Sequence, residues 1–203
     1  MNSKEVIILL ERIETNPNSK LFETIPSKIK NEVLRYQKSI DINTRLHGKI
    51  MLVEIAKILN TSWSWEKFQY VKGEKPSNPF FEFSTSYAGN LVCLAASKNF
   101  KVGIDVEVID EQADYNFIRD YLHANETDFL KSVSNSTNEL LKIWTKKEAY
   151  LKLMGTGIQE DLTQIDTTNS QNNDCFFTEI KHDQNLVISL ATAEQCTYKI
   201  YEK

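Results

Sequence analysis

Two long segments with helical spacing of apolar residues, one in each half of the chain, constrain the fold most strongly. The first covers about residues 41–59, and Asp41 could cap its start because its side-chain oxygen can accept an otherwise unpaired backbone N–H. Its apolar positions, three or four residues apart, are Leu46, Ile50, Val53, Ala56 and Leu59. The second covers residues 138–154 and is followed by Gly155, where a left-handed C-terminal cap is expected. Each helix should therefore pack one face on a core.

Short apolar runs that are typical of β-strands accompany each helix. They cover Val6–Ile13, Leu91–Ser97, Val102–Val108, Cys175–Ile180, Leu186–Leu190 and Thr197–Tyr201. The polar link 98–101 between the second and third runs predicts that these two strands form a hairpin. Strands and one long helix in each half predict an α+β fold. A division near residue 100 is compatible with this pattern, although no linker sequence marks it.

The composition limits the classes of function. With 203 residues and a formal net charge of −4, the chain lacks the basic excess that non-specific nucleic-acid binding needs. No run approaches the roughly 20 apolar residues of a transmembrane helix, so we expect no membrane span. The three cysteines are odd in number and widely spaced, which argues against a disulfide framework and a zinc site. We therefore expect reduced thiols at Cys93, Cys175 and Cys196 and a cytoplasmic location.

The segment 103–107 places two carboxylates two positions apart in an apolar run. Alternate residues of a strand share a side, so Asp105 and Glu107 should face together. The apolar residues of this run should face the core, and they are Ile104, Val106 and Val108. Neighbouring carboxylates repel each other, and Mg²⁺, which prefers a few carboxylates together with phosphate and water oxygens, would remove that cost. The alternative is the solvent-facing side of an edge strand that ends in an acidic turn.

The segment 144–152 lies in the second long helix. Three of its side chains are four residues apart and share one helical face, namely Trp144, Glu148 and Lys152. Lys147 lies one step around the helix. A surface ion pair between the glutamate and the later lysine, beside a tryptophan in the core, is the structural alternative. The glycine turn that follows, Gly155-Thr156-Gly157, could bring backbone close to a ligand.

A third segment, residues 80–86, carries hydroxyl side chains that include Ser84 and Thr85. It follows a turn at residues 73–76 that contains Lys75. Small hydroxyl groups beside a lysine can hold a phosphate group. A hydroxyl-rich strand end explains the same residues equally well.

Together and in this order, the three segments resemble the 4′-phosphopantetheinyl transferase superfamily, in particular its larger, surfactin-synthetase-activating (Sfp) type. The family's Gly-Ile-Asp-x-Glu block is matched by residues 103–107, and its Trp-x-x-Lys-Glu-[Ala/Ser]-x-x-Lys block by residues 144–152. The family's upstream Gly-Lys-Pro and Phe-Asn-x-Ser-His segments correspond to residues 73–76 and 81–85. A weaker match covers residues 41–48.

The chain departs from the family pattern in the upstream segments. Glu74 is inserted into the turn, Glu82 replaces the asparagine, and Thr85 replaces the histidine. In the family that histidine helps to hold the phosphates of coenzyme A, so a neutral threonine predicts a weaker grip on them. None of these departures touches the acidic residues.

The resemblance implies a fold with two pseudo-symmetric halves, each a small antiparallel sheet packed on a long helix, with the active site between them. Residues 1–100 would supply the nucleotide contacts and residues 101–203 the metal-binding carboxylates and the catalytic helix, in one closely associated unit. The reaction would move phosphopantetheine from coenzyme A to a serine hydroxyl of an acyl or peptidyl carrier protein and release adenosine 3′,5′-bisphosphate. It would require Mg²⁺, with Mn²⁺ as a substitute, in a monomeric protein.

The resemblance also implies roles for single residues. The expected metal ligands are Asp105, Glu107 and Glu148. The cations that would neutralise phosphate charge are Lys152 and, as a second candidate, Lys147. The proton of the serine would go to Glu148, which is preferred, or to Glu126, whereas His123 is interpreted as structural. Further contacts to coenzyme A are expected, in falling order, from Lys75, Ser84, Thr85 and Arg45.

Two other functions stay open. The same carboxylates could serve another Mg²⁺-dependent phosphodiesterase, which would need an activated water and no surface for a carrier protein. A non-catalytic module that binds coenzyme A or a carrier protein is the second alternative. The intact acidic residues and Lys152 argue against it, and the departures at Glu82 and Thr85 keep it open.

Overall fold

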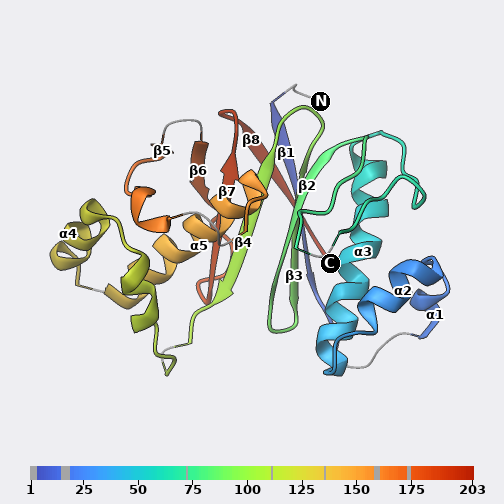
Figure 1. Ribbon diagram of the computed structural model, residues 1–203, viewed down its shortest axis with the longest axis horizontal. Helices are drawn as coiled ribbons and strands as arrows, with labels where there is room; N and C mark the ends of the chain where they lie inside the picture. Colours follow the sequence, from blue (N-terminus) through green and yellow to red (C-terminus); the bar gives the residue numbers. More distant parts are fainter. Residues whose placement is uncertain are drawn as a thin grey trace.

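The computed structural model describes residues 4–14, 19–71, 73–110, 112–134, 136–157, 161–172 and 175–203. Two four-stranded sheets lie side by side at the centre of the molecule, and each is covered by a long helix on its outer face (Figure 1). The strand order is β2-β3-β1-β8 in the first sheet and β4-β7-β6-β5 in the second. This is the α+β architecture with one sheet and one long helix in each half that the sequence predicted.

The first sheet is built from β1 (Glu5–Arg12), β2 (Glu82–Ala88), β3 (Leu91–Ser97) and β8 (Thr197–Glu202). Helix α3 (Ser39–Ile58) covers it, and α1 (Ser19–Phe22) and α2 (Ser27–Val33) lie beside that helix. Ile7 and Leu9 of β1 pack with Leu46, Leu52 and Ile55 of α3 in one buried cluster. Of the five core positions predicted on this helix, Leu46, Ala56 and Leu59 are buried in the cluster and Ile50 packs against it. Val53 is only half-buried and lies outside the cluster, so the core face is shifted from the predicted one toward Leu52 and Ile55.

The second sheet is built from β4 (Val102–Val108), β5 (Gln171–Asn172), β6 (Cys175–Glu179) and β7 (Leu186–Thr192). Helix α5 (Ser136–Met154) packs across β4 and β7. The chain between β4 and α5 forms the 3₁₀ helix η1 (Asn116–Tyr121) and α4 (Ala124–Ser132), and η2 (Leu162–Gln164) follows α5.

Helix α5 approaches β4 very closely at Gly103. A Cβ atom placed there would lie 1.9 Å from the carbonyl oxygen of Ala149 and 2.5 Å from the backbone nitrogen of Leu153. Only a residue without a side chain therefore allows this spacing between helix and strand. At the end of the helix, Gly155 has φ +77° and its N–H donates to the carbonyl of Leu151, which confirms the expected left-handed cap.

The inner faces of the two sheets pack against each other. Val6, Ile8 and Leu10 of β1 point away from α3 and join Ile104 and Val106 of β4 in a second buried cluster. β1 is thus buried on both faces, which explains its continuous apolar sequence. Ile104 and Val106 face the core as predicted, whereas Val108 does not, because it stands at the end of the strand and is 41% exposed.

Two predictions about local structure were wrong. β3 and β4 have the predicted bounds but do not form a hairpin, because β3 pairs with β1 and β2 while β4 pairs with β7. Helix α3 begins at Ser39 after Lys38, so Asp41 lies in its first turn and does not cap it. A carboxylate there still suits the positive end of the helix dipole.

The division at residue 100 does not coincide with the division into sheets. β8 is near the end of the chain, yet it pairs in parallel with β1 in the first sheet, from Glu5 opposite Thr197 to Leu10 opposite Glu202. The first sheet is therefore mixed, and the prediction of an antiparallel sheet in each half was wrong for it. Each half of the sequence thus contributes to the first sheet. In the part of the chain that the structure describes, no helix is both long and apolar enough to cross a membrane. All three cysteines are free thiols.

Candidate active site

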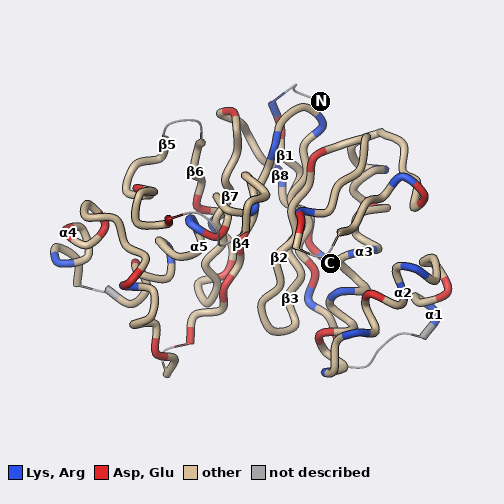
Figure 2. Tube along the Cα trace, in the orientation of Figure 1, with Lys and Arg blue, Asp and Glu red and all other residues tan. Residues whose placement is uncertain are grey.

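A cavity of about 370 Å³ lies between α3, β2 and the C-terminal end of α5, where the two halves meet. It collects six of the residues that the sequence singled out. They are Arg45, Lys75, Ser84, Thr85, Glu148 and Lys152. Acidic positions follow β4 at the edge of this region, and α5 carries both acidic and basic positions (Figure 2). The cavity therefore combines cations and carboxylates from both halves.

Asp105 is the centre of the acidic end of the site. Its side chain is 4% exposed, and its Oδ1 atom accepts hydrogen bonds from Lys152 Nζ at 2.6 Å and from Ser86 Oγ at 2.7 Å. Its Oδ2 atom is buried and has no hydrogen-bond partner among the described residues. A buried carboxylate oxygen without a partner is costly, so this atom is an acceptor available to a ligand.

The negative charge of Asp105 acts on two further carboxylates, Glu107 and Glu148. Burial, followed by the negative charge of Asp105, raises the pKa of Glu107 to about 7. The same two causes raise the pKa of Glu148, and the charge of Lys152 opposes them in both cases. Strand alternation puts Asp105 and Glu107 on the side of β4 that faces α5, as the sequence predicted. Three carboxylates from a strand and a helix thus face one another.

These carboxylates fit a divalent cation. Within the described ranges, no group of three or more His, Cys, Asp or Glu side chains already has the geometry of a metal site. The chemistry of the donors nevertheless suits one, because Asp105 Oδ2 lacks a partner and because like charge raises the pKa of Glu107 and Glu148. A cation among three oxygen donors would give Asp105 Oδ2 a partner and would offset the repulsion among the three carboxylates.

The hydroxyl groups of β2 connect the two sheets. The Ser84 hydroxyl accepts a hydrogen bond from the backbone N–H of Ile104 at 3.1 Å, and the Ser86 hydroxyl accepts one from the N–H of Val106 at 3.3 Å. β4 is the edge strand of its sheet, so these donors would otherwise lack partners. Ser84 lines the cavity, and its hydroxyl group also has this structural role of joining β2 to β4. Thr85 also lines the cavity.

The opposite end of the cavity is basic and aromatic. The guanidinium carbon of Arg45 lies 3.6 Å from the ring centroid of Tyr87 and 5.0 Å from that of Tyr36. Its Nε atom is buried without a hydrogen-bond partner in the described part of the chain. Lys75 donates to the carbonyl of Val102 at 2.8 Å, and burial lowers its pKa to about 8. Cations that are short of acceptors favour an anionic ligand.

Lys49 belongs to the same end of the cavity, although the sequence reasoning missed it. Burial lowers its pKa to about 8, and its Nζ atom lies 4.8 Å from the ring centroid of Phe68 and 5.2 Å from that of Tyr70. Among the described residues no ion pair links it to a carboxylate. The available signal was its position four residues after Arg45, which puts both cations on one face of α3.

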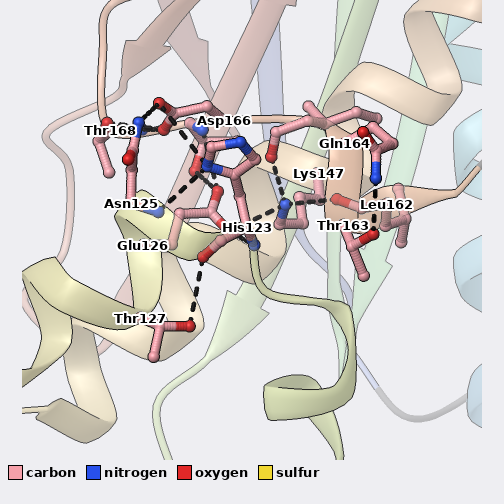
Figure 3. A network of polar contacts seen from close by, with 12 residues as sticks. His123, Asn125, Glu126, Thr127, Lys147, Leu162, Thr163, Gln164, Asp166 and Thr168 are labelled. Carbon is pink, nitrogen blue, oxygen red and sulfur yellow. Dashed lines mark hydrogen bonds and ion pairs between the residues drawn. The ribbon is translucent and has the colours of Figure 1, made fainter.

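Glu126 and Lys147 lie elsewhere, in a polar network that Figure 3 shows from close by. Both side chains are fully buried, and Lys147 Nζ lies 2.9 Å from Glu126 Oε2. Lys147 also donates to the carbonyl oxygens of Leu162 and Ile165, at 2.8 and 2.5 Å. Glu126 accepts from Thr167 and from the backbone N–H of His123. All three Lys147 donors have acceptors, and neither residue lines the cavity.

The predicted roles of Lys147 and Glu126 therefore need correction. This geometry supports neither a phosphate contact by Lys147 nor proton transfer by Glu126, because their bonding capacity is used inside the protein. They join α4 and the 162–167 segment to α5. His123 caps α4, since its Nδ1 accepts from the N–H of Asn125, which confirms its structural interpretation.

Residues 101–198 match the model of the 4′-phosphopantetheinyl transferase superfamily. The chain is 27% identical over 165 residues to the 4′-phosphopantetheinyl transferase gsp of Aneurinibacillus migulanus, which covers 74% of this chain and 66% of that protein. It is 24% identical over 162 residues to the human L-aminoadipate-semialdehyde dehydrogenase-phosphopantetheinyl transferase, covering 70% of this chain and 52% of that one. The 4′-phosphopantetheinyl transferase HetI of a Nostoc species is 28% identical over 143 residues, or 63% of this chain and 60% of the relative.

The matched regions thus span between about half and two thirds of the length of these curated relatives. Among solved structures, the holo-[acyl-carrier-protein] synthase of Thermotoga maritima is similar over 45% of this chain and 61% of that chain, with a TM-score of 0.37 and 20% identity.

Proposed function

We propose that this chain, whose residues 101–198 match the model of the 4′-phosphopantetheinyl transferase superfamily, belongs to that family and moves phosphopantetheine from coenzyme A to a serine hydroxyl of an acyl or peptidyl carrier protein. The second product is adenosine 3′,5′-bisphosphate. The proposal includes a requirement for Mg²⁺, for which Mn²⁺ can substitute. It also includes a monomeric protein that works in the cytoplasm and binds neither nucleic acid nor membranes.

One observation carries the proposal: a single cavity is lined by Arg45, Lys49 and Lys75 at one end and by Glu148 and Lys152 at the other. Asp105 does not itself line the cavity, but it accepts a hydrogen bond from Lys152. Coenzyme A carries two phosphates on the adenosine side of its reactive P–O bond and one on the pantetheine side, so it suits this separation.

Arg45, Lys49 and Lys75 are placed to hold phosphates of the donor, because each is a half-buried cation that forms no ion pair with a carboxylate among the described residues. The charges of Glu32 and Glu82 act on Lys49 and Lys75 without forming such a pair. Apolar side chains between them, such as Leu52 and Phe83, suit the purine ring.

The acidic end would hold the metal and the reacting phosphorus. Asp105, Glu107 and Glu148 are the proposed ligands, through Asp105 Oδ2 in particular. When bound, Mg²⁺ would draw charge from the pyrophosphate oxygens and stabilise the leaving group. Lys152 has three N–H donors and uses two of them, on Asp105 and Ser86, so one stays available for a phosphate oxygen.

In the proposed reaction, the serine oxygen of the carrier attacks the β-phosphorus of coenzyme A. A new bond forms between the serine oxygen and phosphorus, and the bond between phosphorus and the bridging oxygen breaks. The electron pair of that bond leaves with adenosine 3′,5′-bisphosphate. Glu148 accepts the serine proton, and its raised pKa makes it a better base than an ordinary carboxylate.

Intact mass spectrometry of an apo carrier protein, incubated with this protein, coenzyme A and Mg²⁺, tests the proposal. We expect a mass increase of one phosphopantetheine group, and its loss in Glu148→Gln and in the presence of a chelator. Glu139→Gln is the matched control, because Glu139 is on the same helix but pairs with Lys142 at 2.7 Å and does not line the cavity. It should keep its activity.

Two outcomes would contradict the transferase. Binding of coenzyme A without transfer to any of several carrier proteins would favour a non-catalytic binding module. Hydrolysis of coenzyme A at the same rate with and without a carrier would favour a phosphodiesterase.

A further inference from the structure

We propose that Ser86 is a positioning residue that orients Asp105 and Lys152 for binding of the divalent cation. This inference rests on the proposed function, because it concerns the metal that the acidic residues would hold. Ser86 is on β2, in the opposite half of the molecule from both of its functional partners, and it is 4% exposed.

The hydroxyl of Ser86 makes three contacts, which use its full bonding capacity. Its oxygen lies 2.7 Å from Asp105 Oδ1, 2.9 Å from Lys152 Nζ and 3.3 Å from the backbone nitrogen of Val106. A hydroxyl has one hydrogen to donate and two lone pairs. A protonated lysine and a backbone N–H can only donate, so both lone pairs are occupied. The single hydrogen must therefore point to Asp105.

This fixed direction distinguishes the two oxygens of Asp105. Oδ1 receives two hydrogen bonds, from Ser86 and from Lys152, and the third contact in this triangle joins Lys152 to Ser86. Oδ2 receives none. The bond from Ser86 thus holds the carboxylate in the rotamer that commits Oδ1 to the protein and leaves Oδ2 for a cation. Without it, the carboxylate could turn and offer either oxygen to Lys152.

The position of Ser86 is set by the meeting of two edge strands. β2 and β4 are the edge strands of different sheets, and Ser86 bonds the N–H of Val106, the residue directly after Asp105. The same hydroxyl therefore ties the backbone of β4 and its neighbouring carboxylate to the first sheet. Ser84 makes the equivalent backbone contact two residues earlier, but among the described side chains it forms no hydrogen bond with Asp105 or Lys152.

The experiment compares Ser86→Ala with wild type and with Ser189→Ala. Ser189 is a matched control because its hydroxyl is fully buried and lies on β7 directly opposite Asp105 in the strand register, but it bonds Thr145 at 2.8 Å. Both substitutions remove one buried hydroxyl group, so both should lower the unfolding temperature by similar amounts. The first measurement is Mn²⁺ affinity in the absence of coenzyme A, from the electron paramagnetic resonance signal of the free ion.

We expect Ser86→Ala to raise the Mn²⁺ dissociation constant by roughly 10–100-fold, which is typical when a hydrogen-bond partner of a metal ligand is removed. Ser189→Ala should stay within about twofold of wild type, since its hydroxyl touches no proposed ligand. In a transfer assay, Ser86→Ala should need a higher Mg²⁺ concentration for half-maximal rate and should recover part of its rate as Mg²⁺ rises.

Equal Mn²⁺ affinity of Ser86→Ala and wild type would overturn the inference and leave the transferase proposal intact. An equal loss in Ser86→Ala and Ser189→Ala would also overturn it, because the effect would then be one of general packing. A wild-type protein that transfers phosphopantetheine but binds no Mn²⁺ at these residues would also overturn the inference, because these carboxylates would then not be the metal ligands. Absence of transfer, with wild-type Mn²⁺ binding that depends on Ser86, would contradict only the proposed function.

Discussion

Lys152 and Lys147 of helix α5 each pair with a buried carboxylate from another element. Lys152 Nζ lies 2.6 Å from Asp105 and is 30% exposed toward the cavity, and the other oxygen of Asp105 lacks a partner. Lys147 Nζ lies 2.9 Å from Glu126, both side chains are fully buried, and backbone carbonyls complete the network. The residue types are the same, but only the first pair has spare bonding capacity beside a cavity. That capacity distinguishes a binding site from a structural ion pair.

The largest expected effect is on stability, at the structural pair. Lys147→Met should lower the free energy of unfolding by about 3–5 kcal/mol, because it leaves Glu126 buried without its cation. Lys152→Met should cost less, since water in the cavity can solvate Asp105. Urea unfolding of both variants measures the difference. The double variant Glu126→Leu, Lys147→Met should recover much of the loss, because removing both charges removes the unpaired one. Equal losses for the two single lysine variants would contradict the comparison.

The next effect is on catalysis, at the pair beside the cavity. Lys152→Met should reduce kcat by about 10²–10³-fold, the usual cost of losing one group that stabilises charge in a transition state. Lys142→Met serves as the control and should keep its kcat. Lys142 is on the same helix, but it does not line the cavity and its Nζ atom lies 2.7 Å from Glu139. A wild-type kcat in the Lys152 variant would show that this lysine only stabilises Asp105.

A third prediction concerns Lys49. Unlike Lys147 and Lys152, it forms no ion pair among the described residues. Lys49→Met should weaken coenzyme A binding by roughly 10–100-fold, as expected when a charged hydrogen bond to a phosphate is lost. Lys57→Met provides the control, because Lys57 lies on the same helix but is exposed and outside the cavity. Isothermal titration calorimetry gives both dissociation constants. Unchanged affinity for Lys49→Met would assign the donor phosphates to other cations.

The smallest effect is a dependence on pH. Burial lowers the pKa of both Lys49 and Lys75 to about 8, so both are mostly charged at pH 7 and mostly neutral at pH 9. Coenzyme A binding should therefore weaken by roughly tenfold over this interval. The stability of the folded protein depends on pH in the opposite direction. The unfolded chain binds more protons between pH 8 and the ordinary lysine value of 10.5, so these two groups make the folded state more stable as pH rises through that window.

Much of the fold followed from the sequence, and the errors have physical causes. Periodicity located both long helices and the strand bounds, because it reports which residues are buried. It could not report the strand partners. β3 is buried on both faces, between α3 and the second sheet, so its apolar run gives no side preference. Proximity in sequence therefore favoured a β3–β4 hairpin that tertiary packing does not form.

The site was predicted in part for a similar reason. Spacing on one strand and one helix brought Asp105, Glu148 and Lys152 together, because those elements have fixed periods. Lys147 is next to Glu148 in sequence but about 100° around the helix, and only the packing of α4 on α5 shows that it is buried. Ser86 depends on contacts between the two halves, which no single periodic pattern encodes, whereas the four-residue spacing from Arg45 could have indicated Lys49.

The pairing of β8 with β1 has a consequence for the order in which the protein can mature. The paired residues Glu5 and Thr197 are 192 positions apart, so at 5–20 residues per second the ribosome needs roughly 10–40 s to supply the partner strand. Until then β1 is an open edge of the first sheet, where other chains can pair. By the time β8 emerges, every strand of the second sheet has already been made. A nascent chain therefore completes its first sheet only after every strand of the second has been made, and a truncated chain that lacks β8 would remain prone to aggregation.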